Sequence, residues 1–159
     1  MAIAISLKEY LDGNGLDYEV IDHPYASTSL DVAQKAHVPP DKLAKSVVLE
    51  DEGGYVIAVC PASKKIQLGS LYHQINRRLH LADEYELADL IGDCVLGAVP
   101  PLGEPYGADV VVDDSLLSVP DVYIEAGDHE ELIHLDADNF QRLLQNAEHA
   151  SFARSINRV

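Results

Sequence analysis

The sequence predicts a single mixed α/β domain with a curved, barrel-like mixed β-sheet flanked by helices. Short apolar runs in the centre of the chain are typical of buried strands, and helical patterns lie at both ends and in the middle. The 159 residues suit one domain and contain no repeat, low-complexity tract or linker. We therefore expect one domain over residues 1–159, with a core from about residue 7 to 146 and a frayed tail after Ala150.

The N-terminal part of the chain alternates helix and strand signals. Ser6-Leu7-Lys8-Glu9 has the form of a capping box, which predicts a helix from Leu7 to Asn14. A loosely alternating run predicts a strand from Leu16 to Ile21, which ends before a proline. The polar loop Ser27-Thr28-Ser29 then supplies the N-cap of a helix over Leu30–Ala36.

A hairpin is predicted next along the chain. The runs Leu43–Glu50 and Tyr55–Cys60 are apolar enough to be buried strands, and an Asp/Glu/Gly turn joins them. Lys45 stands at the start of the first run. Its side chain either snorkels to solvent or is held where a substrate arrives, and these residues alone leave both interpretations open.

The second half of the chain places further elements around a stiff loop. Three glycines and three prolines among the eleven residues 97–107 disfavour regular structure and predict a shaped loop. The other elements follow from apolar periodicity: strands at Lys64–Leu68, Ala108–Val112, Tyr123–Gly127 and Leu132–Leu135, and helices at Ser70–Asn76, Asp83–Ile91 and from Asp136 through Leu144.

Composition excludes several classes of protein. Asp and Glu number 27 against 11 Lys and Arg, a formal charge of −16, which disfavours coating of nucleic acid through a broad basic face but allows a grip on its end. No apolar run reaches the length of a membrane span, and the apolar segment Met1–Ile5 is too short for the hydrophobic region of a signal peptide. We therefore expect a cytoplasmic protein. Cys60 and Cys94 are expected to be small core side chains.

The usual catalytic devices are missing. There is no Gly-x-Ser-x-Gly elbow, no phosphate-binding glycine loop and no His-Glu-x-x-His, and solvated surfaces explain His73 and His80 better than a metal. We expect no metal and no cofactor. What remains is the Gly/Pro loop, Lys45, the Ser/Thr loop and Gly127-Asp128-His129 at a strand end. Each has a simple structural interpretation, as a connector, a surface charge, a helix cap or a solvated turn.

Together, these segments resemble a known family. Lys45-Ser46-Val47-Val48-Leu49, Gly97-Ala98-Val99-Pro100-Pro101-Leu102-Gly103 and Ala126-Gly127-Asp128-His129 follow one another as in the YbaK/prolyl-tRNA synthetase-associated family of editing domains. Asp22-His23-Pro24 and Asp138-Asn139-Phe140-Gln141-Arg142-Leu143-Leu144 fit the same pattern. The resemblance therefore covers nearly the whole chain.

The resemblance implies a trans-editing deacylase, which hydrolyses the ester between a wrong amino acid and a tRNA. It implies that Lys45 holds the terminal phosphate or the aminoacyl group, that Gly97 and Pro101 bound the aminoacyl pocket, and that His129 matches a histidine of the alanine-removing branch. Since the ester is already activated, water can attack without a protein nucleophile. The other residues expected to contact substrate are Ser27, Thr28, Ser29, Ser46, Ala98, Val99, Pro100 and Gly127.

Specificity and partners are less defined. Ser46 stands where other branches of the family have threonine or asparagine, and Val99-Pro100 is bulkier than the glycine and serine found in other forms of this loop. These departures leave the amino-acid specificity open. The first expected substrate is alanine on proline-specific tRNA, and the second is cysteine. The expected partner is the acceptor end of a mischarged tRNA, with a synthetase left open and neither DNA nor a membrane expected. Two alternatives remain: a non-catalytic module that binds tRNA or a synthetase through the same pocket, and a hydrolase of small esters or amides.

Overall fold

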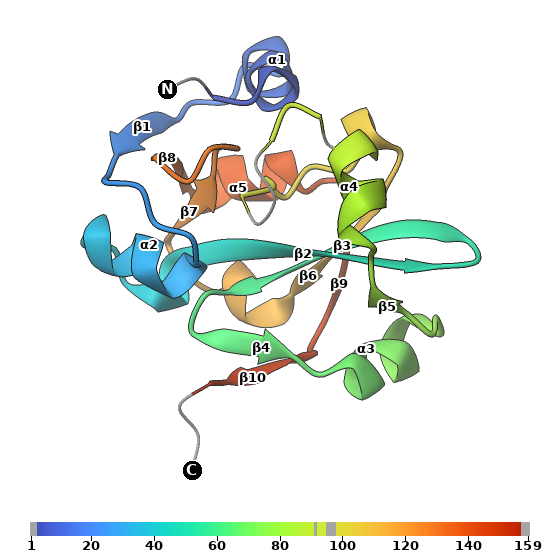
Figure 1. Ribbon diagram of the computed structural model, residues 1–159. Helices are drawn as coiled ribbons and strands as arrows, with labels where there is room; N and C mark the ends of the chain where they lie inside the picture. The colour runs from blue at the N-terminus through green and yellow to red at the C-terminus, as the bar shows by residue number, and fades with distance from the viewer. Residues whose placement is uncertain (1–2, 91, 95–97, 157–159) are drawn as a thin grey trace.

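A large mixed sheet forms the centre of the computed structural model, which describes residues 3–90, 92–94 and 98–156 (Figure 1). Within these residues eight strands pair in the order β1-β8-β7-β2-β3-β6-β9, with β5 beside β2, so the sheet is open and β1 and β9 are its ends. The pairs β2–β7, β3–β6 and β6–β9 are parallel, and the others are antiparallel. The strands are β1 (Glu19–Asp22), β2 (Leu43–Asp51), β3 (Gly54–Pro61), β5 (His80–Leu81), β6 (Asp109–Asp113), β7 (Asp121–Glu125), β8 (Glu131–Asp136) and β9 (Glu148–Ala150).

Helices cover both faces of the sheet. In Figure 1, α1 and α5 lie above β2 and β3, while α3 lies below them beside a two-stranded ribbon of β4 and β10. These elements are α1 (Ile5–Gly13), α2 (Ser29–Lys35), α3 (Leu68–Ile75), α4 (Glu84–Leu90), α5 (Ala137–Leu143), β4 (Lys64–Ile66) and β10 (Ala153–Ser155), with short 3-10 turns at Pro40–Lys42, Glu104–Tyr106 and Asp114–Leu117. The predicted mixed α/β domain with flanking helices is confirmed.

Three clusters of buried apolar side chains hold these layers together. The largest joins one face of the sheet to α1 and α5, and it includes Leu11 and Phe140. A second, on the opposite face, joins the sheet to Leu71 of α3 and to Phe152 near the C-terminus. A third lies under α2 around Val32. Because the sheet is buried on both faces, its central strands read as continuous apolar runs.

The predicted central hairpin is confirmed. β2 and β3 pair antiparallel from Ala44 opposite Pro61 to Asp51 opposite Gly54. The guanidinium of Arg77 donates two hydrogen bonds to Asp51, from Nε at 2.8 Å and from Nη2 at 2.7 Å, and the backbone N–H of Gly53 donates a third at 2.7 Å. These bonds tie the hairpin turn to the segment after α3.

This ion pair predicts a pH-dependent stability. The hydrogen bonds from Arg77 lower the pKa of Asp51 to about 2, from 3.8. Because the folded state lowers this carboxyl pKa, the ion pair stabilises the fold fully at pH values above the ordinary pKa of the carboxyl. The contribution disappears as the pH falls through about 2. In Arg77→Ala we therefore expect lower stability than the wild type near neutral pH and a smaller difference as the pH falls. Urea unfolding at several pH values measures this, and an equal difference at all of them would contradict it.

The predicted capping box is wrong. The N-cap of α1 is Ala4, which makes no side-chain cap, and Ser6 lies inside the helix. The Ser6 hydroxyl instead donates to Asp93 at 2.6 Å and contacts the Tyr106 hydroxyl at 2.7 Å. A tertiary partner far along the chain replaces the local capping interaction here.

The two predicted caps later in the chain are confirmed. Oγ1 of Thr28 accepts from the backbone N–H of Asp31 at 3.2 Å at the start of α2. Asp136 accepts in the same way from Asn139 at 2.8 Å at the start of α5. Other boundaries shift by a few residues: β1 begins three residues later than predicted, at Glu19, and α3 begins two residues earlier, at Leu68.

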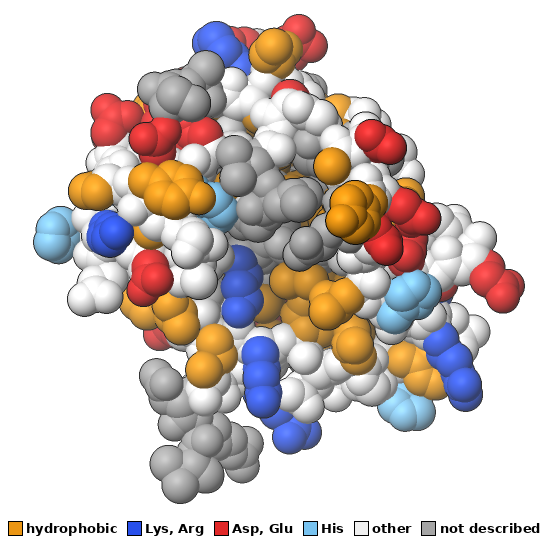
Figure 2. Space-filling view, in the orientation of Figure 1, with side chains coloured by type: hydrophobic (Ala, Val, Ile, Leu, Met, Phe, Trp, Pro, Cys, Tyr) orange, Lys and Arg blue, Asp and Glu red, His pale blue; other side chains and the backbone are white. Residues whose placement is uncertain are grey.

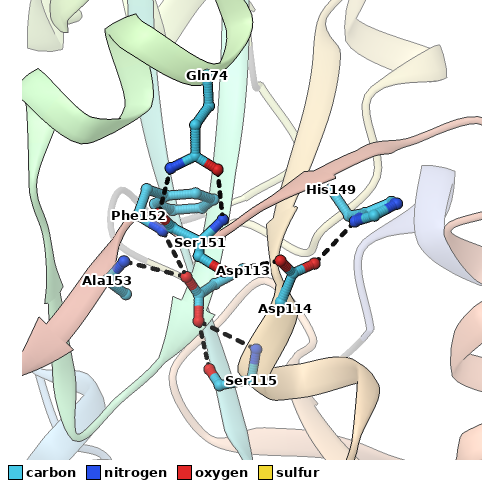
Figure 3. A network of polar contacts seen from close by, with 8 residues as sticks. All are labelled: Gln74, Asp113, Asp114, Ser115, His149, Ser151, Phe152 and Ala153. Atoms are coloured by element: carbon cyan, nitrogen blue, oxygen red, sulfur yellow. Dashed lines mark hydrogen bonds and ion pairs between the residues drawn. The ribbon is translucent and has the colours of Figure 1, made fainter.

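The C-terminal segment is ordered where the sequence suggests a frayed tail. β9 joins the edge of the large sheet beside β6, β10 pairs with β4, and Phe152 between them is 2% exposed. Figure 3 shows the polar contacts that hold it. Oδ1 of Asp113 accepts from the backbone N–H groups of Phe152 at 2.9 Å and of Ala153 at 3.0 Å. The side-chain amide of Gln74 bonds both backbone groups of Ser151.

Candidate functional site

Lys45 lies on β2 beside the end of β7. The parallel pairing of these strands ends with Ala44 opposite Ile124, and Lys45 and Glu125 are the next residues on the two strands. Lys45 is half-buried, and Glu125 is 1% exposed. The strand therefore brings the lysine next to the turn that follows β7.

That turn carries the glycine and histidine predicted from the sequence. Gly127 has φ of +114°, and a Cβ there would lie 2.9 Å from Cβ of Ala4, so glycine is required by conformation and by space. His129 also has a positive φ, 62°, and is 2% exposed. Its Nδ1 lies 2.7 Å from Oε2 of Glu125.

The pairing of His129 with Glu125 corrects the interpretation of His129 as a solvated turn residue. A carboxylate offers only acceptors, so this contact favours a proton on Nδ1 and fixes the orientation of the ring. The ring of Tyr25 meets the imidazole edge-on, with centroids 5.9 Å apart. Asp128 holds the turn itself, since its Oδ1 accepts from the backbone N–H groups of Glu130 and Glu131 at 2.9 and 3.1 Å.

A shallow groove of about 290 Å³ opens beside Lys45. Two lysines, Lys45 and Lys65, stand among apolar side chains there, and Figure 2 shows basic side chains beside a hydrophobic hollow in the middle of this face. The apolar lining residues are Val47, Leu49, Ile66, Leu68 and Leu81. A groove of this character suits a flat, partly apolar group that carries a negative charge.

Ser46 faces away from this groove. Side chains alternate along a strand, and Val48, two residues on, belongs to the core cluster that also holds Val99 and Leu102. The Ser46 hydroxyl is buried and has no hydrogen-bond partner among the described residues. Lys45 and Ser46 therefore lie on opposite faces of the sheet, and the structure does not bring them together.

The described part of the Gly/Pro loop packs into the core. Residues 98–102 are buried, and a Cβ on Gly103 would lie 2.1 Å from the backbone oxygen of Ala108, so only glycine fits. A short 3-10 turn, Glu104–Tyr106, interrupts the predicted irregular loop. Of the residues predicted in this loop, Ala98, Val99, Pro100 and Pro101 are buried, and Gly97 lies outside the described residues.

A polar staple joins the two ends of this loop. Asp93, before the loop, accepts from the hydroxyl of Tyr106, near the end of the loop, at 2.8 Å and from both the hydroxyl and the backbone N–H of Ser6. Burial raises the pKa of Asp93, but the hydrogen bonds from Ser6 and Tyr106 outweigh it and leave the pKa below its ordinary value. Cys94 is half-buried beside Tyr106, and burial raises the pKa of its thiol to about 12. The staple fixes where the loop begins and ends.

The Ser/Thr loop lies at the start of α2. Ser27 and Thr28 are exposed and Ser29 is half-buried, and Thr28 caps the helix. Tyr25, two residues before this loop, is the residue that reaches His129. Sequence reasoning missed Glu125, Tyr25 and Lys65. A charged residue ending the apolar strand before Gly127-Asp128-His129 was the available signal for Glu125.

Within residues 3–90, 92–94 and 98–156, no three His, Cys, Asp or Glu side chains are arranged to hold a metal ion. His73 is exposed, and His80 is largely exposed with a contact to Glu50. None of the described helices is both long and apolar enough to cross a bilayer.

Comparison with known proteins identifies the family. The family model described as the aminoacyl-tRNA editing domain matches residues 23–143. The chain belongs to this family. The match spans Lys45, the Gly/Pro loop and His129, so the resemblance seen in the sequence is confirmed.

Several solved structures share the fold of this chain. One described as "a putative trans-editing enzyme for prolyl tRNA synthetase" is 23% identical with a TM-score of 0.82, over 96% of this chain and 97% of that one. "Hypothetical protein APE2540" is 23% identical with a TM-score of 0.82, over 93% and 99%. A structure from work on epitope grafting onto scaffold proteins is 22% identical with a TM-score of 0.82, over 96% and 97%. No curated protein matches the chain.

Proposed function

We propose that the protein is a trans-editing deacylase, which hydrolyses the ester between a wrong amino acid and the 3′ end of a tRNA. The observation that carries the proposal is Lys45. It belongs to an aminoacyl-tRNA editing domain, it lies beside the Glu125–His129 turn, and no described side chain within 4.0 Å forms an ion pair with it. A half-buried cation in a groove, with no ion-pair partner in the described part of the chain, suits an anionic ligand.

The reaction needs positioning more than a nucleophile. Water adds to the ester carbonyl, the bond from the carbonyl carbon to the ribose oxygen breaks, and the ribose hydroxyl leaves with the proton. Lys45 would hold the phosphate of the terminal nucleotide, and a hydroxyl of the terminal ribose would help to orient the water. The His129 ring, fixed by Glu125, would contact the aminoacyl end. When the reactant is already activated, such positioning can remove a large part of the activation barrier.

The first substrate proposed is alanine on proline-specific tRNA, followed by cysteine on the same tRNA. The reason for a separate site is physical: a pocket distinguishes amino acids that differ by one methylene by only about 1–3 kcal/mol, so a second site that excludes larger side chains improves accuracy. The buried, proline-stiffened segment 98–102 supports such a size limit, because it cannot yield without disturbing the core. Prolyl-tRNA synthetase is the partner that this substrate suggests.

A deacylation screen tests the proposal. Purified protein is mixed with proline tRNA charged with alanine, cysteine, serine or proline, and release of the labelled amino acid is followed. We expect release of alanine or cysteine above the rate in buffer, and no acceleration for correctly charged tRNA. Binding of the tRNA without release would favour the non-catalytic module. Cleavage of simple esters without RNA would favour a small-molecule hydrolase.

A further inference from the structure

The lysine and arginine side chains of the described residues fall into two groups. Members of the first group have an acceptor or a ring within the protein: Lys8 with Asp12, Lys42 with Asp121, Arg77 with Asp51, Lys35 with the Tyr25 backbone oxygen, Arg142 with that of Asn14, and Arg78 over the Tyr72 ring. The second group has no hydrogen bond or ion pair from its side chains to any described residue, and consists of Lys45, Lys64, Lys65 and Arg154. These four lie on β2, β4 and β10 only.

Two cations of the second group face each other across the ribbon. β4 and β10 pair antiparallel with Arg154 opposite Lys65, and both side chains are exposed. Directly opposed like charges in a strand pair destabilise it. In a protein with a formal charge of −16, acidic side chains are plentiful, yet none of those in the described part of the chain forms an ion pair here. The repulsion between Lys65 and Arg154 therefore destabilises the ribbon, and a bound anion would relieve it.

The ribbon is held rigidly against the core. On its inner face Ile66 and Ala153 pack against the cluster around Phe152. Two backbone bonds extend the pairing, from Gln67 N–H to the Phe152 oxygen at 2.7 Å and from Ile156 N–H to the Ser63 oxygen at 3.0 Å. A fixed backbone presents Lys65 and Arg154 in a constant position, which reduces the entropy lost on binding.

The ribbon is continuous with the groove of the candidate site. Lys65 lines the same groove as Lys45. Figure 2 shows basic side chains that follow one another from the middle of this face toward its lower edge, while most carboxylates on this face lie above or to the right. The basic track begins where the proposed substrate terminus is held.

We propose that the β4–β10 ribbon binds the phosphate backbone of the tRNA acceptor arm, just upstream of the terminal nucleotide at Lys45. This rests on the proposed function. The outer face of the ribbon supplies two further cations, Lys65 and Arg154, which matches a grip on a few phosphates at an RNA end in an otherwise acidic protein. Arg154 lies outside residues 23–143, so the family match does not account for it.

The test compares Lys65→Ala/Arg154→Ala with Lys8→Glu. Both variants change the net charge by the same amount, but Lys8 is on α1, away from the ribbon. Binding of an uncharged RNA minihelix ending in CCA is measured by fluorescence anisotropy over a range of salt concentrations. For the ribbon variant we expect about tenfold weaker binding at low salt and a log Kd against log salt slope reduced by about 2. Lys8→Glu should stay within about twofold of wild type and keep its slope.

A second measurement separates this proposal from the proposed function. With an alanyl ester of the minihelix as substrate, the ribbon variant should lose kcat/KM in step with its loss of affinity. With an alanyl ester of the dinucleotide CpA, which lacks the upstream phosphates, Arg154→Ala alone should match the wild type, because Arg154 does not line the groove. If neither the wild type nor the variants hydrolyse either ester, the proposed function fails. The anisotropy data then still show whether the ribbon binds RNA.

Two results would overturn the ribbon proposal. One is equal affinity and salt slope for wild type and ribbon variant, as expected if the ribbon instead bound an acidic protein surface. The other is an equal loss for Lys8→Glu, which would show a general charge effect. Misfolding is excluded by thermal unfolding, where the ribbon variant should be at least as stable as the wild type because the opposed charges are gone.

Discussion

Replacing Lys45 with alanine is expected to lower kcat/KM for deacylation by about 100-fold or more, the usual cost of losing one well-placed charge-stabilising group. The lysine has no ion-pair partner among the described residues and lines an open groove. Its charge is therefore available to the substrate. Initial rates of amino-acid release from the mischarged tRNA identified in the screen measure the effect.

The fold should not depend on Lys45. Because its side chain makes no hydrogen bond to the rest of the described protein, Lys45→Ala should unfold within about 0.5 kcal/mol of wild type. Lys8→Ala, on the exposed face of α1, removes the same charge and should keep full activity. Lys45→Arg keeps the charge on a bulkier head and should fall between wild type and alanine. Full activity in Lys45→Ala would remove the central residue of the proposed mechanism.

The sequence predicted the elements whose signals are local. The apolar runs of β2 and β3 were found because burial on both faces leaves a continuous pattern. The caps at Thr28 and Asp136 are local in another way, since donor and acceptor lie three residues apart. Predictions of this kind need no knowledge of the rest of the fold.

The errors occurred where a distant partner decides the structure. Ser6 looked like a cap, but Asp93 and Tyr106 bind its hydroxyl, and nothing near Ser6 in the sequence indicates them. The last strands have only three residues each, too short to show a period, and their position depends on Asp113. In both cases a tertiary contact overrides the local signal.

The candidate site was predicted in part. Residues were assigned to it by motif, but the two-residue period of a strand already places Lys45 and Ser46 on opposite faces. That argument was available from the sequence. The contact of Lys65 with the same groove, and its pairing with Arg154, depend on a strand register that no local pattern specifies.

Replacing Asp113 with alanine is expected to give the largest loss of stability, about 3 kcal/mol in the free energy of unfolding. The residue is 3% exposed, and its carboxylate accepts from the backbone N–H groups of Phe152, Ala153 and Ser115 and from the Ser115 hydroxyl. Alanine would leave buried donors without an acceptor, which costs more than a missing surface contact. Chemical denaturation measures the loss.

The neighbouring carboxylate is the matched control. Asp114 binds His149 and Ser151 at the surface, with 43% of its side chain exposed, so Asp114→Ala should cost less than about 1 kcal/mol. Asp113→Asn keeps one acceptor oxygen but no charge, and should fall between the two.

The consequence of Asp113→Ala should extend to RNA binding. The variant should lose amide protection at Phe152 and Ala153 in hydrogen exchange before the rest of the sheet exchanges. Because β10 carries Arg154, a loosened tail also moves that cation away from Lys65, and minihelix affinity should fall together with protection. Unchanged protection at Phe152 with a large loss of global stability would show that Asp113 supports the core and not the tail. Loss of protection with unchanged RNA affinity would separate the tail from the proposed RNA track.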